Sequence, residues 1–409
     1  MEPTKRKERI VEVDVLRGVA VLGMVLVDFG SHSMGNYSVA GTFNHVFYRI
    51  QATTDIYDTI HLMFAFLFGW GLAIPMLRSK VRGVPYIGLE LRRLLALFVL
   101  GVANCILLER ADFLYILAMA GAVSLLFVNR SNKTILSSAM LLIAVPVLSK
   151  IILSRIVSPQ TLSDLFGAHA ASYAALNPHV VLTASYRSLV VMRAHEVLGD
   201  LAHPLSYIWA MDMVVMFLFG FYAARRNVFR DISGNLGFIR KVLWCSLAVR
   251  LLGLGSAFVL GRLTLFTTIP TVDQLPSPGP GLELVKLYSD QALALFYMCL
   301  VVLLLQNNML KRISQPVADV GQLALSNYFL HDVIGTTLFF GYGLGLHGKL
   351  GWAVGKGLAV LACGFLMVIS SWWVRKFEFG PAEWVWRCAT YLKIPRFRRR
   401  PEEYKAVPA

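Results

Sequence analysis

The chain has 409 residues, of which 56% are hydrophobic and 15% charged, and its mean hydropathy is +0.61. This composition excludes an ordinary water-soluble protein and indicates a polytopic membrane protein, because the apolar residues form runs of about 20, the length that crosses a bilayer. The net charge of +15 does not indicate nucleic-acid binding, because most cations lie between the apolar runs, where the positive-inside rule explains them.

We expect an all-α, polytopic membrane helix bundle of about ten transmembrane helices, with both termini in the cytoplasm. The apolar runs are 13–33, 55–77, 89–108, 111–128, 134–153, 203–224, 239–260, 286–306, 320–341 and 351–374. The chain therefore divides into a basic cytoplasmic N-terminus (1–12), the first five helices (13–153), an outer-face loop with an amphipathic segment (154–202), the second five helices (203–376) and a basic cytoplasmic tail (377–409).

Four polar side chains interrupt the first apolar run. At about 100° of rotation per residue, Asp14, Arg17, Asp28 and His32 fall within roughly 60° of one helix face. Ionisable groups inside a membrane are costly unless they face a packed interior, a partner or a water-filled cavity, so this stripe is a candidate site. A simpler interpretation of Asp14 and Arg17 is a local ion pair that anchors the helix at the cytoplasmic interface.

Three segments carry a family resemblance: VDVLRGVAVLGMVLVD (13–28), GQLALSNYFLHDVIGTTLFFGYGLGL (321–346) and WWVRKFEFGPAEWVWRCATY (372–391). They resemble the opening Asp-x-Leu-Arg-Gly-x-Ala signature, the Gly-x-x-Ala-Leu-Thr-Asn-Tyr-Leu segment and the closing Phe-Gly-Pro-x-Glu-Trp motif of the YeiB-type membrane protein family. That family is largely of unknown function. It is distantly similar to transmembrane acyltransferases such as heparan-alpha-glucosaminide N-acetyltransferase, in which an acyl group from cytosolic acyl-coenzyme A (acyl-CoA) reaches a sugar across the membrane.

The resemblance implies acyl-CoA or acetyl-CoA as the acyl donor. We expect Arg17, with Asp14 beside it, to contact the phosphates of this donor near the cytoplasmic end of the first helix. The resemblance also implies that His45 corresponds to a histidine in the outer loop of the acyltransferases, and Asp58 to an aspartate at the start of their second helix.

Transfer to a hydroxyl or amine requires a neutral imidazole to take its proton and a group that orients the imidazole. His32, with Asp28 one helical turn earlier, can supply both. His61 with Asp58 three residues before it is a second pair, and His331 is a third candidate base. Each of these histidines is also explained by ordinary helix packing.

Asn327, Tyr328 and His331 share one helix face. We expect Asn327 and Tyr328 either to line the pocket with His61 or to form hydrogen bonds between helices. The adjacent Asp332 is expected to point elsewhere. His331 replaces a glutamine that is common in the family, and Asn104 replaces a common histidine, which makes Asn104 a further pocket residue.

The first functional hypothesis is an integral membrane acyltransferase that moves a short acyl group from cytosolic acyl-CoA to a hydroxyl or amine acceptor at the outer face. The alternatives are a proton-coupled transporter or permease of a small solute, in which the stripe is a proton path, and a non-catalytic membrane scaffold. The expected partners are the lipid bilayer and a small-molecule or glycan acceptor, and a homodimer is left open. The expected location is a bacterial cytoplasmic membrane, as a multi-pass protein. No metal site is expected, because the five cysteines are scattered without a CxxC spacing.

Overall fold

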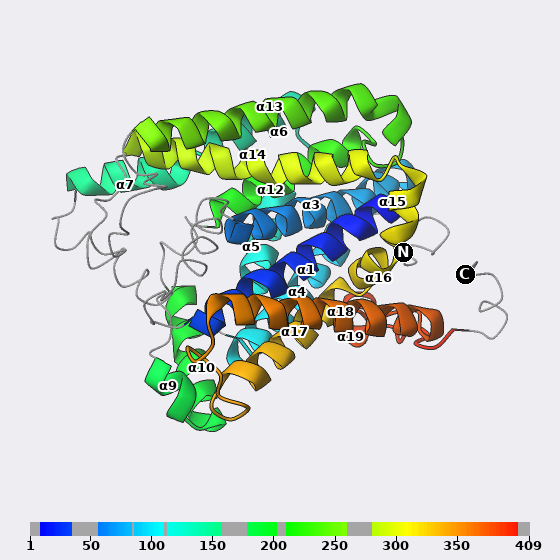
Figure 1. Ribbon diagram of the computed structural model, residues 1–409. Coiled ribbons are helices and arrows are strands. Elements are labelled where there is room, and N and C mark those ends of the chain that lie inside the picture. Colours follow the sequence, from blue (N-terminus) through cyan, green and yellow to red (C-terminus); the bar gives the residue numbers. More distant parts are fainter. Residues whose placement is uncertain are drawn as a thin grey trace.

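The computed structural model describes residues 9–34, 56–83, 86–109, 113–156, 178–202, 210–259 and 280–399. Within these ranges the regular structure is helical, apart from a single β-bridge between Phe377 and Arg398. The prediction of an all-α fold is confirmed for this part of the chain. Figure 1 shows the long helices running in broadly the same direction, with α1 in the middle of the bundle.

The helices are α1 (Val11–Met34), α3 (Ile56–Arg82), α4 (Ile87–Leu107), α5 (Leu114–Ser124) with the 3₁₀ turn η2 (Leu125–Phe127), α6 (Asn132–Leu142), α7 (Val145–Ile156), α9 (Pro178–Thr183), α10 (Tyr186–Ala202), α12 (Met211–Arg225), α13 (Ile232–Val259), α14 (Pro280–Leu304), α15 (Asn308–Ile313), α16 (Gln315–Gln322), α17 (Ala324–Phe339), α18 (Trp352–Lys376) and α19 (Pro381–Tyr391).

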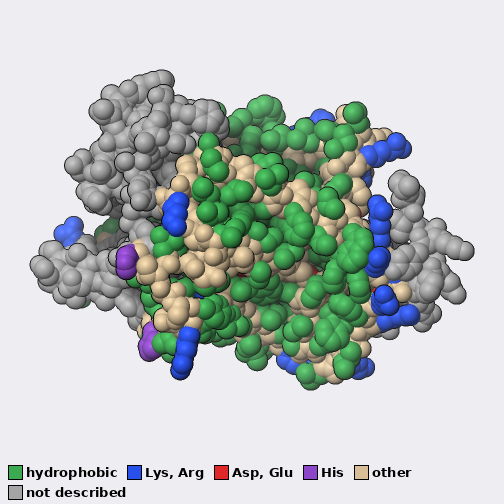
Figure 2. All heavy atoms as spheres, turned by 60° about the horizontal axis from the view of Figure 1, so that its bottom comes forward, with side chains coloured by type: hydrophobic (Ala, Val, Ile, Leu, Met, Phe, Trp, Pro, Cys, Tyr) green, Lys and Arg blue, Asp and Glu red, His purple; other side chains and the backbone are tan. Residues whose placement is uncertain are grey.

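Several helices have the length and composition of membrane spans. Three of them qualify over the described residues, at Asp58–Ser79, Leu284–Leu304 and Trp352–Lys376, and α6 with α7 would add a fourth as one span bent by 45°. Exposed hydrophobic side chains continue along α4, α13 and α18. Hydrophobic side chains cover the middle of the face in Figure 2, while Lys and Arg lie towards its ends. These features are those of a membrane protein.

The apolar run at 320–341 is two helices rather than one. The backbone leaves helical geometry at Leu323, where φ is −109° and ψ is 30°, so that α16 ends and α17 begins. This break leaves the first N–H groups of α17 without acceptors from a preceding helical turn, and they require acceptors from another element.

Helix α1 is packed among α3, α16, α17 and α18. Its contact with α16 is backbone to backbone: a Cβ on Gly18 would collide with the carbonyl of Val317, and a Cβ on Gly321 would collide with the carbonyl of Asp14. Small residues allow membrane helices to approach this closely. Gly18 in the LRG segment and Gly321, which opens the GQLALSNY segment, therefore both allow the close contact between α1 and α16.

We expect Gly18→Ala to lower the melting temperature of the purified protein in detergent, because overpacking of a tight contact costs about 1–3 kcal/mol. The matched control is Gly357→Ala on α18, where an added Cβ meets nothing within 4 Å. The control should leave the melting temperature unchanged or raise it, since Ala has the higher helix propensity. Equal behaviour of the two variants would contradict the close α1–α16 contact.

Candidate functional site

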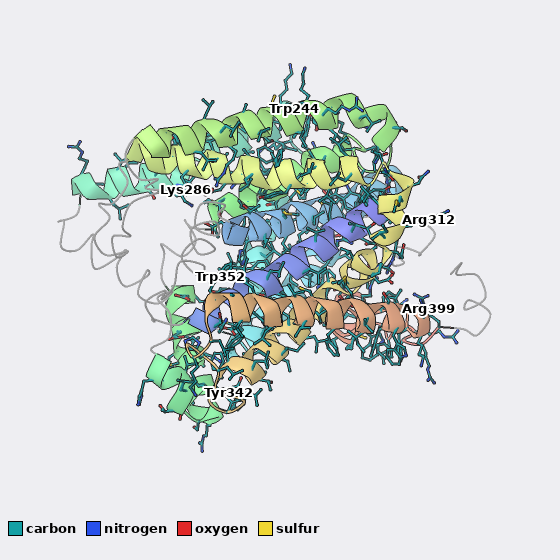
Figure 3. All side chains as sticks on the ribbon, in the orientation of Figure 1. Trp244, Lys286, Arg312, Tyr342, Trp352 and Arg399 are labelled. Atoms are coloured by element: carbon teal, nitrogen blue, oxygen red, sulfur yellow. The ribbon has the colours of Figure 1, made fainter. Side chains whose placement is uncertain are left out.

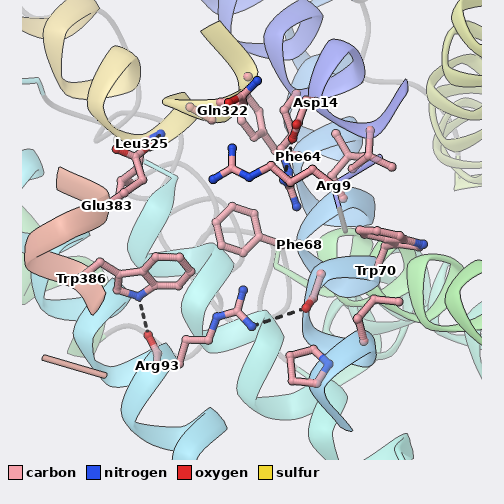
Figure 4. Close-up of a pocket in the computed structure, with 18 of the residues that line it drawn as sticks. Arg9, Asp14, Phe64, Phe68, Trp70, Arg93, Gln322, Leu325, Glu383 and Trp386 are labelled. Carbon is pink, nitrogen blue, oxygen red and sulfur yellow. Dashed lines mark hydrogen bonds and ion pairs between the residues drawn. The ribbon is translucent and has the colours of Figure 1, made fainter. Parts of the chain in front are cut away.

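A cavity of about 250 Å³ lies at the end of the bundle where α1 begins. Its lining includes six arginines and two carboxylates, so the lining is strongly cationic: Arg9, Arg17, Arg78, Arg93, Arg230 and Arg387, with Asp14 and Glu383. Aromatic side chains form much of the remaining wall, and they include Phe64, Phe68, Trp70, Tyr328 and Trp386 (Figure 4). We call this cavity the arginine pocket.

Asp14 and Arg17 form the expected ion pair, with 3.4 Å between Asp14 Oδ1 and Arg17 Nη1. The Asp14 side chain is buried, whereas 32% of the Arg17 side chain is exposed. Both residues line the arginine pocket. The ion pair and the pocket position are therefore compatible, because Asp14 contacts Arg17 while part of the Arg17 side chain stays accessible.

Arg93 on α4 was missed by the sequence analysis. Its Nη1 donates to the Gly71 carbonyl at 3.4 Å and lies 3.5 Å from a Glu90 carboxylate oxygen. Its guanidinium stacks over the Trp386 ring at 4.9 Å, and Trp386 Nε1 donates to the Arg93 carbonyl at 2.9 Å (Figure 4). The only available signal was the Arg-Arg pair at 92–93, which gives no indication of what either side chain contacts.

Glu383 in the closing motif caps the first turn of α17, whose N–H groups have no acceptor within the helix. Its carboxylate accepts hydrogen bonds from the N–H groups of Leu325 at 2.7 Å and Ser326 at 3.2 Å, and from the Ser326 hydroxyl. Burial raises the pKa of the Glu383 carboxyl, and these donors act in the opposite direction. The glutamate of the FGPAEW sequence thus satisfies the N–H groups that the break at Leu323 leaves free.

Arg387, also on α19, lies with its guanidinium 4.4 Å from the centre of the Phe379 ring. Burial lowers the pKa of Arg387 to about 10. The side chain therefore still carries its positive charge at neutral pH and adds to the cationic lining of the arginine pocket.

A second polar cluster, the histidine centre, joins α1 to α17. His331 Nε2 lies 3.0 Å from Asp28 Oδ2 and 3.2 Å from Asp332 Oδ1. His331 Nδ1 lies 2.6 Å from the Tyr328 carbonyl, which can only accept, so Nδ1 carries a proton. The side chains of His331 and Asp332 are each 3% exposed, whereas that of Asp28 is 23% exposed. Asp28 is therefore the accessible member.

The expectation that Asp332 points away from His331 is wrong. Helical spacing separates adjacent Cβ directions by about 100°, but both side chains are long enough to converge. Asn104 Nδ2 donates to Asp332 Oδ2 at 2.6 Å and holds the carboxylate in this position. Asn104, which replaces the common histidine, therefore lies directly behind the histidine centre.

His32 is oriented differently from the proposed His32–Asp28 side-chain pair. Its Nδ1 lies 2.7 Å from the backbone carbonyl of Asp28, while the Asp28 carboxylate contacts His331. His32 Nε2 lies 3.4 Å from Glu109 Oε2. Glu109 follows α4 and is not among the site residues predicted from the sequence.

The arginine pocket and the histidine centre share Tyr328. Tyr328 lines the pocket, and its ring centre lies 5.3 Å from that of His331. The Tyr328 ring also packs edge-on against Phe113 at 5.4 Å. The Tyr328 ring therefore lies against both the cationic cavity and the imidazole.

Three further candidates lie elsewhere. Asn327 donates to Ser370 Oγ at 2.9 Å and to a backbone carbonyl, and it also accepts from Ser370, which joins α17 to α18. His61 packs edge-on against Phe113 at 4.5 Å. Asp58 is 54% exposed and lies 3.5 Å from Lys286 Nζ. His45 lies outside the described residues.

We expect Glu383→Ala to destabilise the protein by about 0.5–2 kcal/mol, because it removes the acceptors at the start of α17. The lower melting temperature in detergent would measure this loss. Glu378→Ala, three residues before α19 begins at Pro381, serves as the matched control on the same segment. A melting temperature that is insensitive to Glu383→Ala would contradict the capping role.

Comparison with known proteins identifies the family. Residues 223–393 match the family described as "Protein of unknown function (DUF418)". The uncharacterized protein YxaH of Bacillus subtilis (strain 168) is 30% identical over 411 residues, which cover 96% of each chain. An uncharacterized 39.9 kDa protein in the amylase 3′ region of Bacillus acidopullulyticus is 24% identical over 399 residues, again 96% of each chain. The uncharacterized protein YeiB of Escherichia coli (strain K12) is 38% identical over 74 residues, 18% of this chain and 19% of that protein. The chain belongs to the YeiB-like family, and its residues 223–393 carry the DUF418 region.

Proposed function

We propose that the protein is an integral membrane acyltransferase, which moves a short acyl group from cytosolic acyl-CoA or acetyl-CoA to a hydroxyl or amine acceptor at the outer face. The observation that supports this proposal most is the position of Tyr328, which lines the arginine pocket and packs against His331. A site for a polyanionic donor thus adjoins the histidine centre, in which the Asp28 carboxylate can accept a proton.

The donor phosphates would bind the arginine pocket. Arginine recognises phosphate by bidentate, charge-assisted hydrogen bonds, and Arg17 and Arg93 both line the cavity. The volume of about 250 Å³ lies just below the range of roughly 300–1,000 Å³ that is typical of small-molecule sites. We therefore place part of the donor inside the pocket, with its acyl end towards Tyr328.

The histidine centre would supply the proton acceptor. The acceptor oxygen or nitrogen attacks the thioester carbonyl carbon, and its proton passes to the accessible Asp28 carboxylate, which is backed by His331. The carbon–sulfur bond then breaks, and the departing coenzyme A thiolate takes up a proton. No metal or redox partner takes part in this sequence of steps.

A proton-coupled transporter is the second candidate. It is favoured by the succession of titratable groups along α1, from Asp14 and Arg17 in the pocket to Asp28 at the histidine centre and His32 beside Glu109. Such a row can conduct protons through a membrane. The two candidates differ in the fate of the thioester, which only the acyltransferase consumes.

We also propose a multi-pass topology of about ten spans in a bacterial cytoplasmic membrane, with both termini in the cytoplasm. The six arginines of the pocket support this orientation, because they come from widely separated parts of the chain and gather at one end of the bundle. Arg312 and Arg399 lie at this same end in Figure 3, while Trp352 and Lys286 lie towards the other.

Turnover of labelled acetyl-CoA in proteoliposomes tests the proposed activity. Asp28→Asn removes the proposed proton acceptor and should lower kcat by about 10²–10⁴, the usual contribution of a general base, with KM little changed. His331→Gln removes the imidazole that backs Asp28 and should also lower kcat. Arg17→Gln and Arg93→Gln should each raise KM about tenfold, because each removes a charge-assisted contact to phosphate.

Arg312→Gln is the matched control, because Arg312 is an exposed cation at the same end of the molecule and is not part of the pocket lining (Figure 3). It should behave as the parent protein does. A solute flux driven by a proton gradient, with the thioester intact, would favour the transporter. Consumption of the thioester that does not depend on His331, Arg17 or Arg93 would overturn the proposed site.

Cysteine labelling on intact cells tests the topology. In a cysteine-free background, Lys349→Cys before α18 should react with a membrane-impermeant maleimide. Lys133→Cys at the start of α6 should react only after permeabilisation, because it belongs to a cytoplasmic cation cluster. The reverse pattern would show that the orientation is inverted.

A further inference from the structure

Arg193 on α10 is an unusual buried cation. The residue is 0% exposed, and its guanidinium lies 5.0 Å from the centre of the Phe340 ring. Its Nη1 donates to the Leu107 carbonyl at 3.5 Å, a long hydrogen bond. Within the described part of the chain, its Nε and Nη2 have no hydrogen-bond partner.

This arrangement is expensive without a ligand. A guanidinium stays charged in proteins, and a buried charge whose donors are unpaired carries a large desolvation penalty. Nε and Nη2 form one edge of the planar guanidinium, and two parallel donors on such an edge match the two oxygens of a carboxylate or phosphate. The unpaired edge of Arg193 therefore has the geometry of an anion-binding group.

His347, in the connection between α17 and α18, is another buried polar side chain. The residue is 7% exposed, and neither ring nitrogen has a hydrogen-bond partner among the described residues. Burial, together with the neighbouring His32, lowers the pKa of His347 to about 4. The imidazole is therefore neutral at physiological pH and offers one donor and one acceptor.

Arg193 and His347 lie around the same neighbours. The His32 ring centre is 6.0 Å from that of His347 and 6.1 Å from that of Phe340. The Phe340 ring is the one that the Arg193 guanidinium contacts. In Figure 1, α9 and α10 lie where α1 ends, away from the start of α1 and its arginine pocket. His32 is one helical turn from Asp28 on α1. The cluster of Arg193, His347 and His32 therefore adjoins the histidine centre on the side away from the arginine pocket.

We propose that Arg193 and His347 form the acceptor site, and that the acceptor carries a carboxylate or phosphate group next to its reactive hydroxyl or amine. Arg193 binds the anionic group through Nε and Nη2, and His347 hydrogen-bonds to a neutral polar group of the same molecule. The acceptor role rests on the proposed acyltransferase function, whereas binding of an anionic ligand at Arg193 does not.

Ligand-induced stabilisation of the full chain in detergent tests this assignment. The probes are glucuronate and glycerol 3-phosphate, with glucose and glycerol as their neutral counterparts, each titrated with coenzyme A present so that the arginine pocket is occupied. At least one anionic probe should raise the melting temperature, and its neutral counterpart should not. Arg193→Gln should raise the Kd of that anionic probe at least tenfold, because it removes the charged guanidinium and its two parallel donors.

Arg187→Gln is the matched control, an exposed arginine on the same helix, and should bind the probe as the parent protein does. Arg193→Lys keeps the positive charge but loses the two parallel N–H donors of the guanidinium. Weaker probe binding by an Arg193→Lys variant that still folds would therefore show that Arg193 recognises the anion and does not act only through folding. Equal stabilisation by charged and neutral probes, or unchanged affinity in both Arg193 variants, would overturn the assignment.

A double variant, Arg17→Gln with Arg93→Gln, separates this inference from the proposed function. It should lose stabilisation by coenzyme A and keep Arg193-dependent binding of the anionic probe. If coenzyme A fails to stabilise the parent protein while the anionic probe still binds through Arg193, the donor assignment fails and the anion site stands. Loss of probe binding in the double variant would instead place the anion in the arginine pocket.

Discussion

The contact between Asp28 on α1 and His331 on α17 is the interaction that organises the interior of this protein. The imidazole lies between two carboxylates and a backbone carbonyl, with almost no exposed surface. Such a group is tolerated in a membrane protein only when neighbouring helices surround it and provide acceptors. The glycine contact between α1 and α16, the break at Leu323 and the Glu383 cap all serve this purpose, because they bring α17 against α1 and satisfy its first turn.

Polar groups lie on both sides of this contact along α1. On one side is the arginine pocket, whose lining residue Tyr328 packs against His331. On the other side are His32, Glu109 and His347, with Arg193 beyond Phe340. In the proposed reaction the donor and the acceptor therefore approach one proton-accepting centre from opposite ends. The order of the groups follows from α1 itself, because Asp14, Arg17, Asp28 and His32 share one of its faces.

Features that depend on periodicity within one segment could be predicted from the sequence. These were the all-helical fold, the polar face of α1, the family resemblance and the Asp14–Arg17 ion pair. Partnerships between helices could not be predicted, because they depend on which faces meet in three dimensions. Arg93, Glu109 and Arg193 each gain their place in a cluster from a different helix pair, and Asp332 turns towards His331 because Asn104 holds it. The closing motif revealed the family but not its physical role, since Glu383 acts on a helix start created by a break that hydropathy does not reveal.

A structure of the full chain bound to an acetyl-CoA analogue that cannot transfer its acyl group would test the central claim most directly. We expect the phosphates to lie against Arg17 and Arg93 and the acyl carbonyl to lie beside Tyr328, facing His331 and Asp28. An analogue bound away from the arginine pocket, or with its acyl group directed away from His331, would contradict it.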